Sequence, residues 1–249
     1  MKLTIAFTIS CLREKYLRQT LDSWSKVRGI QDAHLLFCLE PLTFRAHPFP
    51  VAEFGEFVRR SFASSRVVSN EVRKGCFINT RDTMDHAFAG GADFAVLAEE
   101  DLVVSADVLE YFIWAQKFKD EQQVQTVCAH SFETSGQLHQ VVRADWFSPL
   151  VWGTWPDRWH SFIRPGWGGI PTNPEAWDTN LRYLVRNHGQ LSVFPAWSRS
   201  QHIGRVSTLT PGPLAEYFYQ GSISKTFHLD YPQRAEYSEV PRDSIRLIV

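Results

Sequence analysis

The stretch FAVLAEEDLVVSADVLEYF, from Phe94 to Phe112, decides how this chain is expected to fold. It begins with an apolar run that is typical of a buried strand, and it ends with apolar residues at helical spacing. Between the two lie three consecutive carboxylates, Glu99, Glu100 and Asp101. This acidic triplet is therefore predicted to lie in a short connection between a strand and a helix.

The rest of the chain repeats this alternation. Strands are predicted at Leu3–Ser10, His34–Glu40, Arg66–Val72, Asp93–Ala98, Val124–Ala129 and Leu191–Ala196. Two helices are predicted at Arg13–Val27 and Ile78–Ala89. A third is predicted after a cap at Ser105, and its apolar face contains Val108, Leu109, Phe112 and Ile113. A fourth is capped by Asn173 and runs from Pro174 to Gly189. Such alternation predicts an α/β domain with a mixed, mainly parallel sheet flanked by helices. In such sheets ligands bind at the carboxyl ends of the strands, where the acidic triplet is expected.

The composition argues against several classes of protein. Lys and Arg total 26 against 27 for Asp and Glu in 249 residues, so no strong overall field would attract nucleic acids or anionic membranes. No segment approaches the roughly 20 apolar residues that span a bilayer, and no signal peptide is evident, so a cytoplasmic location is expected. The four cysteines, Cys11, Cys38, Cys76 and Cys128, are widely separated and are interpreted as buried thiols.

The acidic triplet has two interpretations on the residues alone. Mg²⁺ prefers carboxylate oxygens and is commonly shared between one or two carboxylates and the phosphates of a substrate. Glu100 and Asp101 at the end of a strand suit that arrangement. In a chain with 27 acidic residues, a solvated turn is an equally good interpretation. A zinc site is not expected, because His and Cys residues at the required spacing are absent.

The segment Phe94–Phe112 resembles the strand, acidic triplet and helix of N-acetylglucosaminyltransferase I and of related bacterial and phage nucleotide-sugar glycosyltransferases with the GT-A fold. Further segments match in the same order: ISCLREKYLRQTLDSW, INTRD, VWGTWPDRW and WDTNLRYLVRNHGQLSVFPAWSRSQHIG. The resemblance extends from Leu3 to Thr210. It implies a single GT-A (Rossmann-like) domain over residues 1–210, and residues 211–249 are expected to form a C-terminal extension that is packed on this domain or partly loose.

The resemblance also implies roles for the residues that match. Asp101 would bind a divalent metal, Mn²⁺ or Mg²⁺, while Glu99 and Glu100 would face the ribose and sugar of a UDP-sugar donor. Glu40 would lie near the uracil. Three more residues would contact the nucleotide or face it: Arg13, Asn79 and Arg81.

The helix that contains Trp177 and Asp178 would supply the catalytic base. In the resembled family this helix delivers a carboxylate that removes the proton of the acceptor hydroxyl in an inverting transfer, which implies this role for Asp178. N-acetylglucosaminyltransferase I has two adjacent acids there and uses the second, a position that Thr179 occupies in this chain. The alternative is that Asp178 pairs with Arg182 one helical turn away.

The segment Ser198–Thr208 fits a loop that closes over a donor and excludes water. Arg199 and Arg205 would neutralise diphosphate oxygens, and Gly204 would permit the bend. The alternative interpretation of Arg205 is an exposed surface charge without a role in binding. His202 is either a second metal ligand or a structural residue.

Five tryptophans crowd the segment between Trp146 and Pro174, unlike any flexible linker. Most are expected to be core residues. Trp152 or Trp155 is expected to line the acceptor side.

Three functions remain open at this stage. The first is a metal-dependent inverting glycosyltransferase that moves a sugar from a UDP-sugar to an acceptor hydroxyl of a glycan or a small molecule. The second is a viral enzyme that glycosylates a hydroxymethylated DNA base, which would need a basic groove containing Arg143, Arg158, His160 and Arg164. The third is a non-catalytic sugar-binding module that uses tryptophans as stacking platforms.

Overall fold

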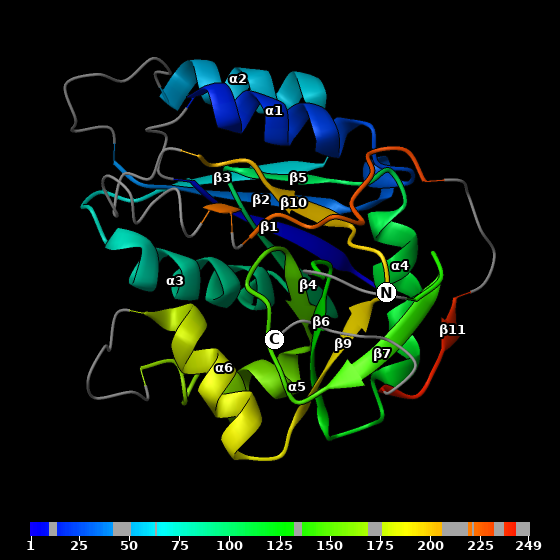
Figure 1. Cartoon of the computed structure of the whole chain (residues 1–249). Helices are drawn as coiled ribbons and strands as arrows, with labels where there is room; N and C mark the ends of the chain where they lie inside the picture. Colours follow the sequence, from blue (N-terminus) through cyan, green and yellow to red (C-terminus); the bar gives the residue numbers. More distant parts are fainter. Residues whose placement is uncertain are drawn as a thin grey trace.

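The computed structural model describes residues 1–9, 14–41, 51–62, 64–131, 136–168, 176–205, 219–220, 222–231 and 237–242. Strands and helices alternate along most of the chain (Figure 1). The helices are α1 (Glu14–Ser25), α2 (Val51–Ser61), α3 (Gly75–Ala89), α4 (Val108–Trp114), α5 (Pro156–Arg158) and α6 (Trp177–Asn187), with helical turns η1 (Ile30–Asp32), η2 (Ala115–Phe118) and η3 (Trp159–Ile163). The strands are β1 (Leu3–Ile9), β2 (His34–Leu39), β3 (Ser65–Ser69), β4 (Phe94–Glu99), β5 (Leu102–Val104), β6 (Val124–Cys128), β7 (Gln140–Ala144), β8 (Trp152–Thr154), β9 (Leu191–Pro195), β10 (Ser200–His202) and β11 (Ser238–Glu239).

The centre of the molecule is a nine-stranded sheet with the order β11-β7-β9-β6-β8-β4-β1-β2-β3. Strands β4, β1, β2 and β3 are mutually parallel, and β6 is parallel to β9. Strand β8 lies between β4 and β6 and is antiparallel to both. The predicted mixed, mainly parallel sheet in a single domain is therefore confirmed. A separate antiparallel pair, β5 and β10, lies outside this sheet.

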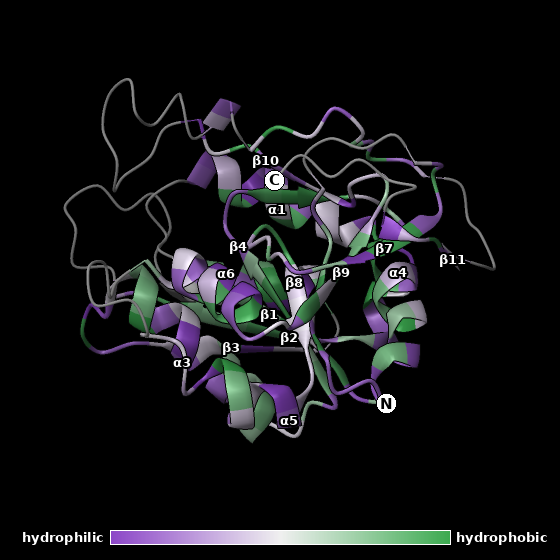
Figure 2. Cartoon of the chain, turned by 60° about the horizontal axis from the view of Figure 1, so that its bottom comes forward, coloured by the Kyte–Doolittle hydropathy of each residue, from purple (hydrophilic) through white to green (hydrophobic). Residues whose placement is uncertain are grey.

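Helices cover both faces of the sheet, which explains why its central strands are buried on both sides. In Figure 1, α1 and α2 lie on one face, and α3 and α6 lie on the other. All seven residues of β1 are buried, and its side chains alternate between the two cores: Phe7 packs with Trp24 and Phe37 on one face, and Ala6 belongs to the other core. Figure 2 shows the hydrophobic colouring concentrated on the central strands and mixed on the helices around them.

Most of the predicted elements are present, with differences at their ends. Helix α4 is preceded by Asp107 and not by Ser105, whose hydroxyl donates to Asp107 Oδ1 at 2.6 Å. Ile113 is 53% exposed, so it does not belong to the buried face of this helix. Helix α6 begins at Trp177, three residues later than predicted, and Asn173 and Pro174 lie outside the described residues.

The tryptophan-rich segment forms β8, α5 and η3 and belongs to the core. Trp152, Trp155 and Trp159 are fully buried, and Trp167 is 2% exposed. The buried-thiol prediction is confirmed for Cys38 and Cys128 and is wrong for Cys76, which is exposed, whereas Cys11 lies outside the described residues. Within the described ranges, no helix has the length and apolar character needed to cross a membrane.

Candidate active site

The carboxyl ends of three parallel strands bring the predicted site residues to one edge of the sheet. Strand β1 pairs in register with β4, Thr8 opposite Glu99, and with β2, Ile9 opposite Leu39. The pairing continues one residue further, since Glu40 N donates to Ile9 O at 2.9 Å. Glu40 and the acidic triplet therefore follow strands on either side of β1.

The acidic triplet is not a solvated turn. Glu100 and Asp101 are only 2% and 3% exposed, whereas Glu99 is partly exposed. Thr20 of α1 donates its hydroxyl to Glu100 O at 2.9 Å, which fixes the backbone of the turn. The triplet leads into β5 and not directly into a helix, so the predicted short connection contains a further small strand.

A loop far away in the sequence covers Asp101. Strand β10 pairs with β5, and just beyond it Ile203 N donates to Asp101 O at 2.9 Å. His202 Nε2 lies 3.1 Å from Asp101 Oδ2. A methyl group on Gly204 would clash with that same oxygen and would lie 2.8 Å from His202 Nε2, so only glycine permits this close approach.

This pair of side chains fits a divalent cation. A carboxylate oxygen and an imidazole nitrogen that face each other at 3.1 Å are both donor atoms that Mn²⁺ accepts in proteins. No cluster of three or more potential ligands occurs among the residues that the structure describes. The arrangement therefore suits an ion that takes its remaining ligands from a substrate and from water, as is usual for nucleotide-bound Mg²⁺.

Glu40 presents a buried acceptor at the same edge. It is 8% exposed, and its Oε2 accepts a hydrogen bond from Lys74 N at 2.9 Å. Its Oε1 is buried and has no hydrogen-bond partner within the described part of the chain. A buried carboxylate oxygen without a partner is costly, so it marks a place where a ligand N–H would be favourable.

Asn79 and Arg81 lie on α3 and differ in what they offer to a ligand. Asn79 is 2% exposed: its amide donates to Thr8 Oγ1 at 2.9 Å and accepts from Asn70 Nδ2 at 2.8 Å. It braces the end of β1. Arg81 is partly exposed and pairs with Asp82 at 3.0 Å. Arg13 lies outside the described residues.

Asp178 lies in the first turn of α6 and is partly exposed. Cys76 Sγ is 3.7 Å from Glu99 Oε1, and desolvation together with the charges of Glu99 and Asp178 raises the pKa of that thiol. The alternative partner, Arg182, lies over the Trp146 ring at 4.4 Å, and its Nε has no hydrogen-bond partner among the described residues. The pairing of Asp178 with Arg182 stays an alternative, because burial lowers the pKa of Arg182 while the charge of Asp178 raises it.

Arg199 does not face a diphosphate, which corrects the role predicted for it. Its side chain is fully buried, with Nε 3.1 Å from Asp107 Oδ2 and the guanidinium 4.5 Å from the centre of the Tyr231 ring. Tyr237 donates to the same Asp107 oxygen at 2.8 Å. Arg199 is therefore part of the core.

Arg205 is exposed and lies 6.0 Å from the Tyr219 ring, beside the closing loop.

The predicted acceptor role of Trp152 and Trp155 is also wrong. Both are fully buried in the sheet core, where Trp152 packs against Trp177 and Trp155 packs against Phe94. They are inaccessible to an acceptor because β8 is an interior strand of the sheet.

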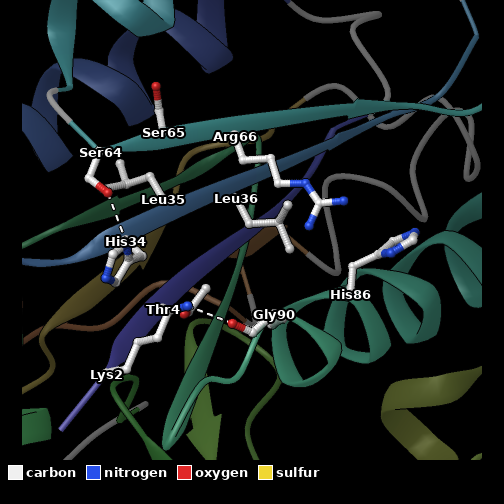
Figure 3. Close-up of a pocket in the computed structure, with 11 residues that line it drawn as sticks. Lys2, Thr4, His34, Leu35, Leu36, Ser64, Ser65, Arg66, His86 and Gly90 are labelled. Atoms are coloured by element: carbon white, nitrogen blue, oxygen red, sulfur yellow. Dashed lines mark hydrogen bonds between the residues drawn. The ribbon is translucent and has the colours of Figure 1, made fainter.

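A pocket does exist at the opposite edge of the sheet, lined by Lys2, Thr4, His34 and Arg66 among others (Figure 3). It lies at the amino ends of the strands and is not part of the candidate site.

Sequence reasoning missed Ser222, Tyr219 and Cys76. Ser222 Oγ lies 2.9 Å from His202 Nδ1, and the Tyr219 ring lies 6.0 Å from the His202 ring. Nothing in the local sequence connects these residues with His202, which is 20 positions away from Ser222. Cys76 stands in the first turn of α3, which the sequence predicted to begin three residues later.

No protein-family model matches the chain, and neither does any curated protein. Similar solved structures exist. TarS of S. aureus has a TM-score of 0.57 at 13% identity, covering 88% of this chain and 38% of TarS. The structure of TarS residues 1–349 in complex with UDP-GlcNAc has a TM-score of 0.53 at 13% identity, covering 88% of this chain and 64% of that one. The mannosyltransferase PcManGT of Pyrobaculum calidifontis, in complex with GDP-Man and Mn²⁺, gives 0.54 at 14% identity, with 78% and 54% coverage.

The chain spans less than two thirds of the length of each of these proteins. At such low identity the similarity shows the fold. The predicted fold of a nucleotide-sugar glycosyltransferase is thereby confirmed, without specific support for N-acetylglucosaminyltransferase I.

Proposed function

We propose that this protein is a metal-dependent inverting glycosyltransferase that transfers a sugar from a UDP-sugar to an acceptor hydroxyl. The observation that carries the proposal is the buried carboxylate of Asp101 at the carboxyl end of β4, with His202 Nε2 at 3.1 Å from it. The similar structures support the donor class, since one was solved with UDP-GlcNAc and another with GDP-Man and Mn²⁺.

Asp101 and His202 would hold the cation, which when bound would supply positive charge to stabilise the departing diphosphate. Glu40 Oε1, which lacks a partner among the described residues, would accept the imide N–H of uracil. Glu99, partly exposed at the end of β4, would face the sugar or ribose. Glu100 is 2% exposed, so in place of the predicted contact with the sugar or ribose it would maintain the turn.

Asp178 would act as the general base. It would take the proton of the acceptor hydroxyl as that oxygen forms its bond to the anomeric carbon and the bond from this carbon to the diphosphate oxygen breaks. Attack opposite the leaving group inverts the configuration. General-base assistance of this kind is typically worth about 10²–10⁴ in rate. The loop after β10 would cover the donor and limit its hydrolysis by water.

The two other functions receive less support. A sugar-binding module with tryptophan platforms is disfavoured because Trp152 and Trp155 are buried. The basic groove required for DNA is disfavoured because Arg143 pairs with Glu121 and Arg164 with Asp85, while Arg158 is 3% exposed. A gel-shift assay with modified and unmodified duplexes at two salt concentrations would reveal DNA binding directly.

The first test is UDP release from a panel of UDP-sugars with and without Mn²⁺. Asp101→Asn should reduce Mn²⁺-dependent release by at least about 10²-fold, because it removes the ligand charge at nearly unchanged volume. Gly204→Ala should reduce it as well, because the added methyl group meets Asp101 Oδ2. Asp120→Asn, at an exposed position, is the matched control and should leave release unchanged. Full activity of Asp101→Asn would refute the proposal.

A further inference from the structure

The chain beyond residue 210 contributes to the site through the loop that carries His202. Ser224 N donates to Gln201 Oε1 at 2.9 Å, and the Tyr219 ring lies 6.0 Å from both the His202 ring and the Arg205 guanidinium. This part of the sequence matches no motif of the resembled family. Its described residues nevertheless contact the loop at Gln201, His202 and Arg205.

The hydrogen bonds of Ser222 determine which nitrogen of His202 carries the proton. Ser222 Oγ lies 2.7 Å from Tyr219 O, and a carbonyl can only accept, so the single hydroxyl hydrogen is used there. The same Oγ lies 2.9 Å from His202 Nδ1 and must therefore accept. Nδ1 therefore carries a proton, and a ring with only this one proton has its lone pair on Nε2.

Nε2 faces Asp101 Oδ2 at 3.1 Å. A carboxylate can only accept, so in the metal-free protein this contact is favourable when Nε2 also carries a proton, and a divalent cation bound between the two atoms would take the place of that proton. Ser222 is itself well anchored, because its carbonyl oxygen lies 3.0 Å from Nε2 of the fully buried His130. The hydroxyl is thus held in a defined place relative to the core.

We infer that Ser222 is a positioning residue for the metal site: its hydroxyl accepts from His202 Nδ1 and so fixes the ring orientation and the tautomer in which Nε2 is the ligand. The inference rests on the proposed function, since it concerns the cation that Asp101 and His202 would share. Outer hydrogen bonds of this kind orient metal-ligating histidines, and their loss typically costs about 10–100-fold in metal affinity.

The test measures Mn²⁺ binding by the electron paramagnetic resonance signal of the free ion, in the presence of UDP. Ser222→Ala should weaken binding about 10–100-fold, and Ser222→Thr, which keeps the hydroxyl, should restore most of it. Ser224→Ala is the matched control from the same segment and should bind like the wild type, because its contact with Gln201 is made by the backbone. In the metal-free wild type, ¹⁵N chemical shifts of His202 should show a protonated Nδ1, and Ser222→Ala should lose this preference.

The outcomes separate the two proposals. If the wild type binds Mn²⁺ and Ser222→Ala binds it equally well, the positioning role is overturned and the proposed function stands. If the wild type and Asp101→Asn both fail to bind Mn²⁺, both proposals fall. If Nδ1 of His202 carries no proton in the metal-free protein, the inferred hydrogen bond to Ser222 is wrong, whatever the affinities.

Discussion

The burial of Asp101 could be predicted from the sequence, whereas the burial of Arg199 could not. The burial of Asp101 follows from its flanks, an apolar strand before it and a second short strand after it. Arg199 and Arg205 look alike in the sequence, six positions apart, and only the fold distinguishes them. The partners of Arg199 are distant along the chain, 92 positions away in the case of Asp107, so no local pattern could predict its burial.

Substitution of Arg199 should lower the free energy of unfolding strongly, whereas substitution of Arg205 should hardly change it. Arg199→Ala leaves the carboxylate of Asp107 buried without its counter-charge, so the free energy of unfolding should fall by about 3–5 kcal/mol. Arg205→Ala, at an exposed position, should change it by less than about 0.5 kcal/mol. Urea denaturation of both variants provides the measurement. An Arg199→Ala protein that is as stable as the wild type but has lost donor binding would favour the role in diphosphate binding that the sequence suggested.

At the scale of elements, the long periodic segments were predictable and the short ones were not. Strands β1, β2, β4, β6 and β9 and helices α1 and α3 follow from runs of apolar residues at the expected spacing. Strands β8 and β10 have three residues each, too few for a period to be visible. Helix α2 was not predicted, although Phe54 and Val58 are fully buried at helical spacing and Pro50, directly before the helix, is a typical starting signal.

Two glycines test the assignment of α2 and of the end of α3. Gly55 lies within α2, and a methyl group there would meet only Arg59, at 3.9 Å. Gly55→Ala should therefore stabilise the protein by about 0.5–1 kcal/mol. Gly91 follows α3 with φ of 80°, so Gly91→Ala should destabilise it by about 1–2 kcal/mol. Thermal unfolding of the pair decides the matter, and a destabilised Gly55→Ala variant would contradict a helical α2.

At the scale of the whole molecule, distant segments meet at His130. This residue is fully buried between the Ser148 hydroxyl and the Ser222 carbonyl, and burial lowers its pKa from 6.5 to about 3. The location of the C-terminal segment could not be predicted, because its contacts are made with residues up to 203 positions away. The predicted boundary at residue 210 stays a prediction, although β11 pairs with β7 of the main sheet.

The depressed pKa of His130 makes stability depend on pH. In the unfolded chain the imidazole takes up a proton near pH 6.5, whereas in the folded protein it stays neutral down to about pH 3. Its contribution is therefore complete above pH 6.5 and is lost as the pH falls toward 3. At about 1.4 kcal/mol per pH unit, the wild type should lose about 2 kcal/mol more between pH 7 and pH 5 than His130→Gln does.

Urea denaturation at the two pH values gives this difference. The exposed His34→Gln variant serves as the control and should show the pH dependence of the wild type. An unchanged pH dependence in His130→Gln would mean that His130 is not held neutral in the folded protein.

The most direct measurement is anomalous diffraction at the manganese edge from crystals grown with Mn²⁺ and UDP. We expect one anomalous peak in contact with Asp101, with His202 as a second protein ligand and the diphosphate of UDP completing the site. UDP bound elsewhere, or bound at this edge of the sheet with no anomalous peak beside Asp101, would contradict the account.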